Sequence, residues 1–175
     1  MLTLAILAAS VLPAFAATAT HRFVHPQGDY ALEYPSSWKR SVGMEMLKLR
    51  PSGAAGKLVR ISIEKHPLGA KDPATPSAFI ADLLKNAKGL RRLDARDTVR
   101  VSGKDAERLT LTETMELKDE SDRKLPGPLT EVVIVVAFQK GCYVLRLSGM
   151  GADLASVRPT FNRLVSSFTL GPLAR

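Results

Sequence analysis

The chain of 175 residues has little cysteine, histidine or aromatic side chain, and these shortages restrict its chemistry. Its single cysteine, Cys142, excludes an internal disulfide, which a domain of this size does not need. Aromatic residues make up 6% of the chain, and no zinc-finger or helix-turn-helix spacing occurs, so we expect no nucleic-acid binding despite a net charge of +8. Length and composition predict one domain with its own core.

The motifs that mark common catalytic sites are also missing. There is no Gly-x-Ser-x-Gly elbow, and the glycine pairs at 53–56 and 149–151 lack the residues of a phosphate loop and the spacing of a dinucleotide turn. His21, His25 and His66 lie near predicted strand ends or before prolines, as is typical of surface loops. We therefore predict a protein that is not an enzyme, with no catalytic residue and no cofactor.

His21, His25 and Asp29 follow one another at intervals of four residues. On a helix this spacing would bring the three side chains together and suggest a metal site. The intervening residues favour a strand, however, and Pro26 and Gly28 interrupt a helix. In an extended chain the two histidines would stand about 13 Å apart, at ~3.3 Å per residue. We therefore predict no metal site.

The first sixteen residues carry no charged side chain and are mostly apolar. They end in Ala14-Phe15-Ala16, a pattern typical of a signal peptidase site. The apolar run is shorter than the ~20 residues of a membrane-spanning helix, and Pro13 interrupts it. We predict a periplasmic or secreted protein with a signal peptide at 1–16, an unstructured lead-in at 17–21 and one domain at 22–171. The alternative is that the run forms the first element of the fold.

Apolar residues at every second position predict two strands, with Tyr30, Leu32 and Tyr34 in one and Val59, Ile61 and Ile63 in the other. In the second strand, Arg60, Ser62 and Glu64 then face solvent. A strand at 46–49 between them completes an antiparallel meander with one solvated face.

Two helices are predicted by apolar residues at helical spacing. The first lies between Thr75 and Gly89, with Thr75 as N-cap, Pro76 at the first helical position and Gly89 just past the end. The second has Asp153 as its candidate N-cap, and Pro159 should kink it or mark its first turn. Its apolar positions are Leu154, Val157, Phe161, Leu164, Val165 and Phe168.

Residues 132–138 are apolar on both faces of a strand, which predicts a central strand that is covered from each side. This strand turns at Lys140-Gly141 into another at 142–148. Residues 99–101 and 106–114 predict a hairpin around Ser102-Gly103-Lys104, and the charged segment 116–124 predicts an exposed loop. A strand covered twice needs helices on both faces of the sheet.

Three segments carry a family resemblance: Gly-Asp-Tyr-Ala-Leu-Glu-Tyr-Pro-Ser-Ser-Trp at 28–38, Val-Ser-Gly-Lys-Asp-Ala at 101–106, and Arg-Pro-Thr-Phe at 158–161 with Ser-Ser-Phe at 166–168. Together they resemble the Mog1/PsbP-like family. The resemblance implies an α+β fold, an α-β-α sandwich with a central, mostly antiparallel sheet and a helix layer on each face. It implies no single activity, since members bind other proteins or stabilise assemblies and catalysis is not the family habit.

Two groups of residues are candidates for a partner or ligand surface. Tyr30, Tyr34 and Trp38 combine apolar area with polar atoms and suit a groove, although they suit the packing of a sheet edge as well. The segment 85–108 holds eight basic residues against four acidic ones. A solvated helix end and strand face explain this excess, but an anionic partner would also fit it. The candidates there are Arg91, Arg92 and Arg96.

Cys142 has two interpretations, a reactive thiol or a small apolar core residue, and the lack of a nearby histidine in sequence favours the core.

For the whole chain we predict a monomeric, non-catalytic, exported module that binds a protein partner or supports assembly of an envelope complex. Its basic charge favours an anionic partner or contact with a membrane surface. The alternatives are a carrier of a small apolar ligand or lipid and, more remotely, a hydrolase.

Overall fold

The computed structural model describes residues 19–53, 58–67, 75–113 and 127–172. Its elements are β1 (Thr20–Val24), β2 (Tyr30–Pro35), β3 (Lys39–Val42), β4 (Met46–Arg50), β5 (Arg60–Pro67), α1 (Pro76–Ala87), β6 (Arg91–Val101), β7 (Lys104–Glu113), β8 (Leu129–Phe138), β9 (Gly141–Met150), α2 (Gly151–Ser167) and β10 (Thr169–Leu170).

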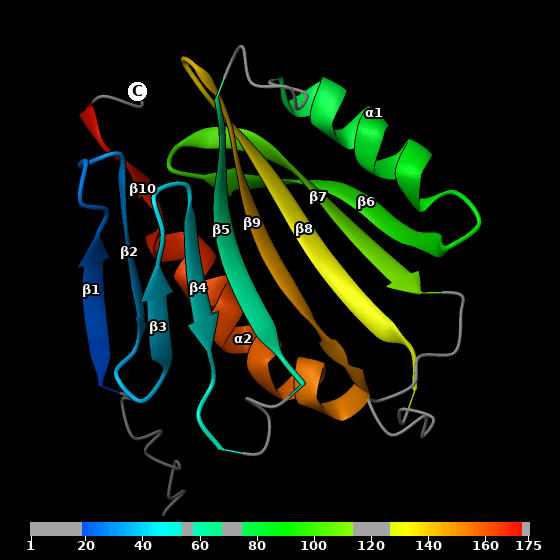
Figure 1. The fold of residues 1–175 in the computed structure, drawn as a ribbon, viewed down its shortest axis with the longest axis horizontal. Coiled ribbons are helices and arrows are strands. Elements are labelled where there is room, and N and C mark those ends of the chain that lie inside the picture. The colour runs from blue at the N-terminus through cyan, green and yellow to red at the C-terminus, as the bar shows by residue number, and fades with distance from the viewer. Residues whose placement is uncertain (1–18, 54–57, 68–74, 114–126, 173–175) are drawn as a thin grey trace, which may run out of the picture.

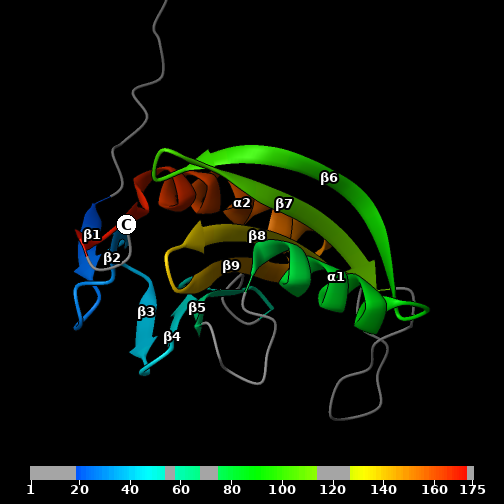
Figure 2. The same cartoon turned by 90° about the horizontal axis from the view of Figure 1, so that it is seen from above.

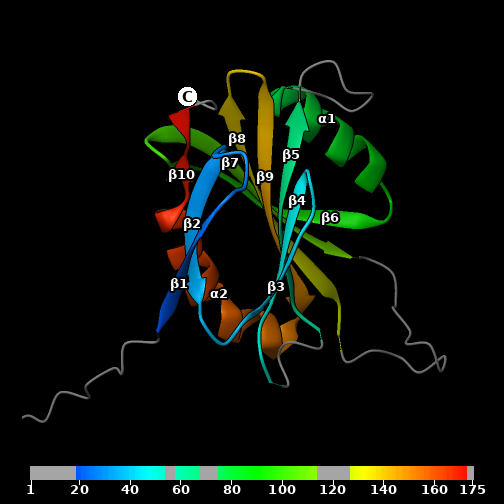
Figure 3. The ribbon, with the colours of Figure 1, turned by 60° about the vertical axis from the view of Figure 1, so that its left-hand side comes forward.

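The strands form two antiparallel sheets (Figure 1). The small sheet has the order β1-β2-β10, and the large sheet has the order β3-β4-β5-β9-β8-β7-β6. Figure 3 shows the small sheet at one side of the molecule, where β10 continues from α2. In Figure 2, β6 and β7 curve over α2. The described residues therefore form a mostly antiparallel α+β structure with two helices.

The small sheet corrects the predicted meander. β4 and β5 do pair, but β2 pairs with β1 and β10, and the unpredicted β3 lies beside β4. The chain turns after β2, where the Trp38 amide donates to the Pro35 carbonyl at 3.0 Å. β1 begins at Thr20 and so includes the last two residues of the predicted lead-in at 17–21, where Thr20 pairs with Pro35 and His21 with Tyr34.

β8 lies between β9 and β7, and residues 131–136 are all buried, which confirms the predicted central strand. Its alternate residues belong to different hydrophobic clusters. Val132, Ile134 and Val136 pack in the cluster that includes the apolar side chains of α2. Val133 and Val135 pack in the cluster that includes those of α1. The strand therefore buries apolar area on both of its faces.

α1 has the predicted boundaries. Thr75 Oγ1 accepts a hydrogen bond from the Ala78 amide at 3.2 Å, and Pro76 is the first helical residue. Gly89 adopts a φ of +82° just past the end, a conformation that glycine adopts without strain. Local capping chemistry therefore fixes both ends of this helix.

α2 corrects the predicted N-cap. The helix begins at Gly151, and Met150 is the N-cap residue without a side-chain hydrogen bond. Asp153 lies in the first turn, where its charge interacts favourably with the helix dipole. Pro159 lies inside the helix, so it does not mark the first turn.

The predicted hairpin is confirmed as β6 and β7, joined by Ser102 and Gly103 with φ of 51° and 75°. Two positive φ values in a two-residue turn match the twist of the adjoining strands.

The predicted signal peptide at 1–16 and the predicted loop at 116–124 lie outside the described residues. Neither helix of the described part is long and apolar enough to cross a membrane.

Candidate binding groove on the large sheet

A groove of about 290 Å³ opens on the large sheet over β4, β5 and β9. Four cationic side chains and one carboxylate contribute to its lining, so the lining is net positive. The other lining residues add the Ser62 and Ser148 hydroxyl groups and the Met46 side chain, while the side chains of Leu49 and Ile61 are buried on the opposite face of the sheet. The whole set is Met46, Lys48, Leu49, Arg50, Arg60, Ile61, Ser62, Glu64, Arg146 and Ser148.

Strand pairing explains why these side chains share a face. Lys48 pairs with Ser62, and Ser62 pairs with Arg146, so the three form a row across the sheet. Arg60 pairs with Ser148 in the next row. Ile61, between Arg60 and Ser62, is buried on the opposite face, which confirms the predicted alternation of β5.

Three of the groove cations have no ionic partner in the part of the chain that the structure describes. Lys48, Arg50 and Arg60 are exposed, and none forms an ion pair with another described residue. Lys39 on β3 is likewise exposed without an ion pair there, and it stands directly opposite Arg50. Like charges in directly opposed positions destabilise a sheet. This group, which we call the open cations (Lys39, Lys48, Arg50 and Arg60), therefore carries uncompensated positive charge.

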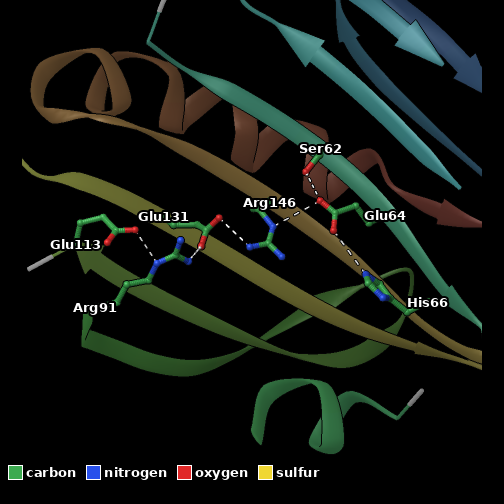
Figure 4. A network of polar contacts seen from close by, with 7 residues as sticks. All are labelled: Ser62, Glu64, His66, Arg91, Glu113, Glu131 and Arg146. Atoms are coloured by element: carbon green, nitrogen blue, oxygen red, sulfur yellow. Dashed lines mark hydrogen bonds and ion pairs between the residues drawn. The ribbon is translucent and has the colours of Figure 1, made fainter. Parts of the chain in front are cut away.

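Arg146, the fourth cation of the groove, belongs to a chain of ion pairs that crosses the sheet (Figure 4). Arg91 Nε lies 2.7 Å from Glu113 Oε1, and Arg91 Nη1 lies 2.7 Å from Glu131 Oε2. Arg146 Nη1 lies 2.8 Å from Glu131 Oε1, and Arg146 Nε lies 3.6 Å from Glu64 Oε1. Positive and negative groups alternate, so the chain holds the Arg146 guanidinium in place.

Glu64 connects this chain to a hydroxyl and an imidazole. The Ser62 hydroxyl donates to Glu64 Oε1 at 2.7 Å, and His66 Nε2 lies 3.6 Å from Oε2 (Figure 4). Burial alone would raise the pKa of Glu64, but His66, Arg146 and Ser62 outweigh it and lower that pKa. In a hydrolytic triad the imidazole stands between hydroxyl and carboxylate. Here the carboxylate stands between them, so His66 does not activate Ser62.

The predicted arginines lie on β6, at the opposite edge of the large sheet from β3. Arg91 belongs to the chain of ion pairs, Arg92 Nε lies 2.6 Å from Asp94, and Arg96 Nη2 lies 2.6 Å from Glu107. Two more arginines of the hairpin are paired, Arg100 with Asp105 and Arg108 with Asp97. The pairs neutralise most of the charge that the sequence concentrates there. Partner binding by Arg91, Arg92 and Arg96 stays a prediction.

The three predicted aromatic residues lie on other elements than these arginines, since Tyr30 and Tyr34 are on β2 of the small sheet and Trp38 directly precedes β3, at the other edge of the large sheet. Tyr30 and Tyr34 are only 3% and 5% exposed, whereas Trp38 is half-buried against the core. Tyr30 stacks on His25 and on Phe168, with ring centroids 5.0 Å and 5.3 Å apart. Burial, and then the Asp29 charge, raises the pKa of Tyr30.

His25 and Asp29 come together where the chain turns at Gly28, whose amide donates to the His25 carbonyl at 2.7 Å. His25 Nδ1 lies 3.6 Å from Asp29 Oδ2, and Lys65 Nζ donates to that oxygen at 2.6 Å. His21 packs instead against Tyr34, with ring centroids 6.0 Å apart. Within the described ranges, no three metal-ligating side chains gather in a suitable group.

Cys142 is fully buried in the cluster that α1 covers. Burial raises the pKa of its thiol to about 11. A thiol needs its deprotonated form to react, and this environment disfavours that form at neutral pH. The position therefore suits a core residue.

Together, the described ranges of the chain form an α+β structure with a seven-stranded antiparallel sheet, two helices and a cationic groove. The fold is Mog1/PsbP-like. The cyanobacterial PsbP protein CyanoP from Synechocystis is similar with a TM-score of 0.59 and 13% identity, over 92% of this chain and 98% of that chain. The Ran-binding protein Mog1p of Saccharomyces cerevisiae has a TM-score of 0.57 and 10% identity, over 88% of this chain and 96% of that one.

LpqN of Mycobacterium tuberculosis, which is involved in cell envelope biogenesis, has a TM-score of 0.51 and 13% identity, over 88% of this chain and 91% of its own. No family model and no curated protein sequence matches this chain. At these identities the similarity concerns the fold alone. Function has to be argued from the site.

Proposed function

We propose that this protein is an exported, non-catalytic module that binds an acidic segment of a protein partner in the groove over β4, β5 and β9. The observation that carries the proposal is the unpaired state of Lys48, Arg50 and Arg60 among the described residues. Positive side chains that repel one another in one groove weaken the folded state, and partner carboxylates would offset that repulsion.

The proteins of similar fold support a binding role. Mog1p is a Ran-binding protein, and LpqN is involved in cell envelope biogenesis. The proposal assigns this chain a binding or assembly role of the same general kind. The apolar segment at 1–16, with its peptidase pattern, supports export to the periplasm or beyond.

The proposal includes an α-β-α sandwich that acts as a monomer. The two hydrophobic clusters on alternate residues of β8 support the sandwich, because α1 contributes to one and α2 to the other. A sandwich with α1 on one face leaves the strands beyond that helix available to a partner. β4, whose Lys48 and Arg50 are exposed, belongs to that part of the sheet.

The alternatives receive less support from the sites described. The Ser62, Glu64 and His66 arrangement has the wrong order for a hydrolase. A second cavity of about 490 Å³, beside α2, includes Arg158 and Asn162 in its lining. Charged and amide groups in the lining do not favour a purely apolar ligand.

The test compares two triple charge reversals of equal net charge. The groove variant carries Lys48→Glu, Arg50→Glu and Arg60→Glu. The control carries Lys85→Glu, Lys88→Glu and Lys140→Glu, which are exposed positions on α1, just after it and in the β8–β9 turn. Both are used in crosslinking and pull-down from an envelope fraction.

We expect the groove variant to lose a stoichiometric protein partner by roughly tenfold, while the control retains it. The difference between the variants is the supporting result, because unspecific capture by positive charge would fall equally in both. Equal capture by both variants would contradict the proposal. Copurification of lipid without a protein would contradict it too.

A further inference from the structure

The groove cations lie in two rows that cross the strands. The first row is Lys48, Ser62 and Arg146, and the second contains Arg60 and Ser148, with Arg50 just beyond the last β4–β5 pair. The rows are two residues apart along each strand. Residues on one face of a strand repeat at roughly 6.6–6.8 Å, so this distance separates the rows.

An extended peptide has the same repeat as the strands. Its side chains at positions i and i+2 point to one side, roughly 6.6–6.8 Å apart. A segment that lies along the groove can therefore place one carboxylate at each row. Two adjacent acidic residues cannot do so, because the second side chain points away from the sheet.

The groove also limits the number of acidic positions. Glu64 is two residues beyond Ser62 on β5 and faces the same side, so it occupies the row after Lys48 and Arg146. Its pKa is lowered below the ordinary carboxyl value, and it is ionised at neutral pH. A third carboxylate in that direction would meet a negative charge. Two acidic positions therefore match the cationic rows.

We propose that the groove selects an extended segment with two acidic residues separated by one other residue, the pattern acid-x-acid. This inference rests on the proposed function and specifies what the partner presents. The Ser148 hydroxyl, in the row of Arg60, supplies a further hydrogen-bond donor for a carboxylate oxygen, whereas the Ser62 hydroxyl already donates to Glu64. The lining is recessed, so a flat layer of lipid headgroups would fit it less well than a peptide chain.

The experiment uses the whole protein in its exported form. It is mixed with two labelled nine-residue peptides of identical composition. One peptide has two glutamates separated by a threonine, and the other has the same glutamates adjacent. Binding is measured by fluorescence anisotropy at low ionic strength. We expect roughly fivefold tighter binding of the separated pattern, a preference that increases in dilute salt and falls in concentrated salt.

Variants locate the preference in the groove. Lys48→Glu with Arg60→Glu, which alters both rows, should abolish the difference between the peptides. Lys85→Glu with Lys88→Glu, on and next to α1, should keep it. Circular dichroism confirms that each variant is folded before binding is measured.

Equal binding of the two peptides, or no binding of either, overturns the spacing rule. Tighter binding to vesicles that contain phosphatidylglycerol than to either peptide overturns it as well, because a headgroup layer has no fixed acid spacing. These failures differ from failure of the proposed function. That function fails if the groove reversal leaves capture of the native partner unchanged, or if lipid copurifies without a protein.

Discussion

Glu64 forms an ion pair with Arg146 and also lines the groove, so its ionisation changes the charge of both the ion-pair chain and the groove. Its carboxylate is half-buried, and burial alone would raise its pKa. The His66, Arg146 and Ser62 groups lower that pKa instead. A carboxyl group with a lower pKa in the folded state stabilises the fold at pH above its unfolded value. This contribution is lost as the pH falls through the folded pKa.

Glu64→Gln tests this balance. At pH 7 we expect the variant to lose about 1–3 kcal/mol of unfolding free energy, since Arg146 Nε loses the nearby charge. The loss should shrink as the pH falls below 4.5, the ordinary value for this carboxyl, because the unfolded chain then takes up a proton, and it should be gone below the lowered pKa of the folded state. Urea denaturation at several pH values measures it. Glu45→Gln, at an exposed carboxylate, is the control.

A gap between wild type and Glu64→Gln that stays constant down to pH 3 would show that ionised Glu64 does not contribute. The same titration separates this residue from the hairpin carboxylates. Asp94 and Asp97 also have lowered pKa values, through hydrogen bonds from Thr112 and from Arg108 respectively. They remain in the variant, so its residual pH dependence belongs to them and to the other acidic groups.

At the scale of elements, local signals were enough to predict α1 and β8. Thr75 and Gly89 mark the ends of α1, and the apolar run at 132–138 has no polar face. β3 was missed because its four residues are all exposed and show no apolar alternation. The small sheet was missed because pairing between β2 and β10 joins distant parts of the chain.

The groove could not be predicted as a unit, although part of it could. The alternation of β5 places Arg60, Ser62 and Glu64 on one face, but Lys48 and Arg146 join them only through pairing with β4 and β9. The ion pairs of the hairpin formed by β6 and β7 could have been predicted. Its two-residue turn fixes the register, which sets acidic residues close to the arginines across the two strands.

Gly141→Ala tests how closely β9 approaches β5. Gly141 has a φ of +144°, and an added Cβ would overlap the His66 carbonyl oxygen on the neighbouring strand. Gly103 also has a positive φ, but an added Cβ there meets open space. We expect Gly103→Ala to cost about 1–2 kcal/mol for the backbone conformation alone. Gly141→Ala should cost about 1–3 kcal/mol more, because the strands must separate.

Chemical denaturation of both glycine variants provides the comparison. The difference between the two losses, not either loss alone, reports the contact between β9 and β5. Equal losses would mean that the turn at Gly141 shifts without disturbing the sheet. In that case the edge of the groove near β9 would be less rigid than the pairing of Arg60 with Ser148 indicates.

At the scale of the whole molecule, the net charge of +8 is not evenly distributed. The arginines of β6 and β7 have acidic partners, whereas the open cations on β3, β4 and β5 have none among the described residues. The sequence concentrates basic residues in the first region, but strand pairing brings four cations without a described ionic partner close together in the second. Uncompensated charge at one site is a cost that binding can offset.

Arg50→Gln tests whether this excess weakens the fold. Arg50 stands opposite Lys39 and lines the groove with Arg60, so its removal relieves repulsion with two cations. We expect unfolding free energy to rise by about 0.2–1 kcal/mol at low ionic strength. The gain should disappear at about 1 M salt, where the screening length is roughly 3 Å. The same variant should bind the separated glutamate peptide more weakly.

Arg92→Gln is the matched control, since Arg92 is also exposed but is paired with Asp94. Its removal should leave stability unchanged or slightly reduced at low salt, and it should not change peptide binding. If Arg50→Gln also fails to stabilise the protein at low salt, the open cations do not repel one another. The groove would then carry no unfavourable charge for a partner's carboxylates to offset, which would contradict the proposed binding of an acidic segment.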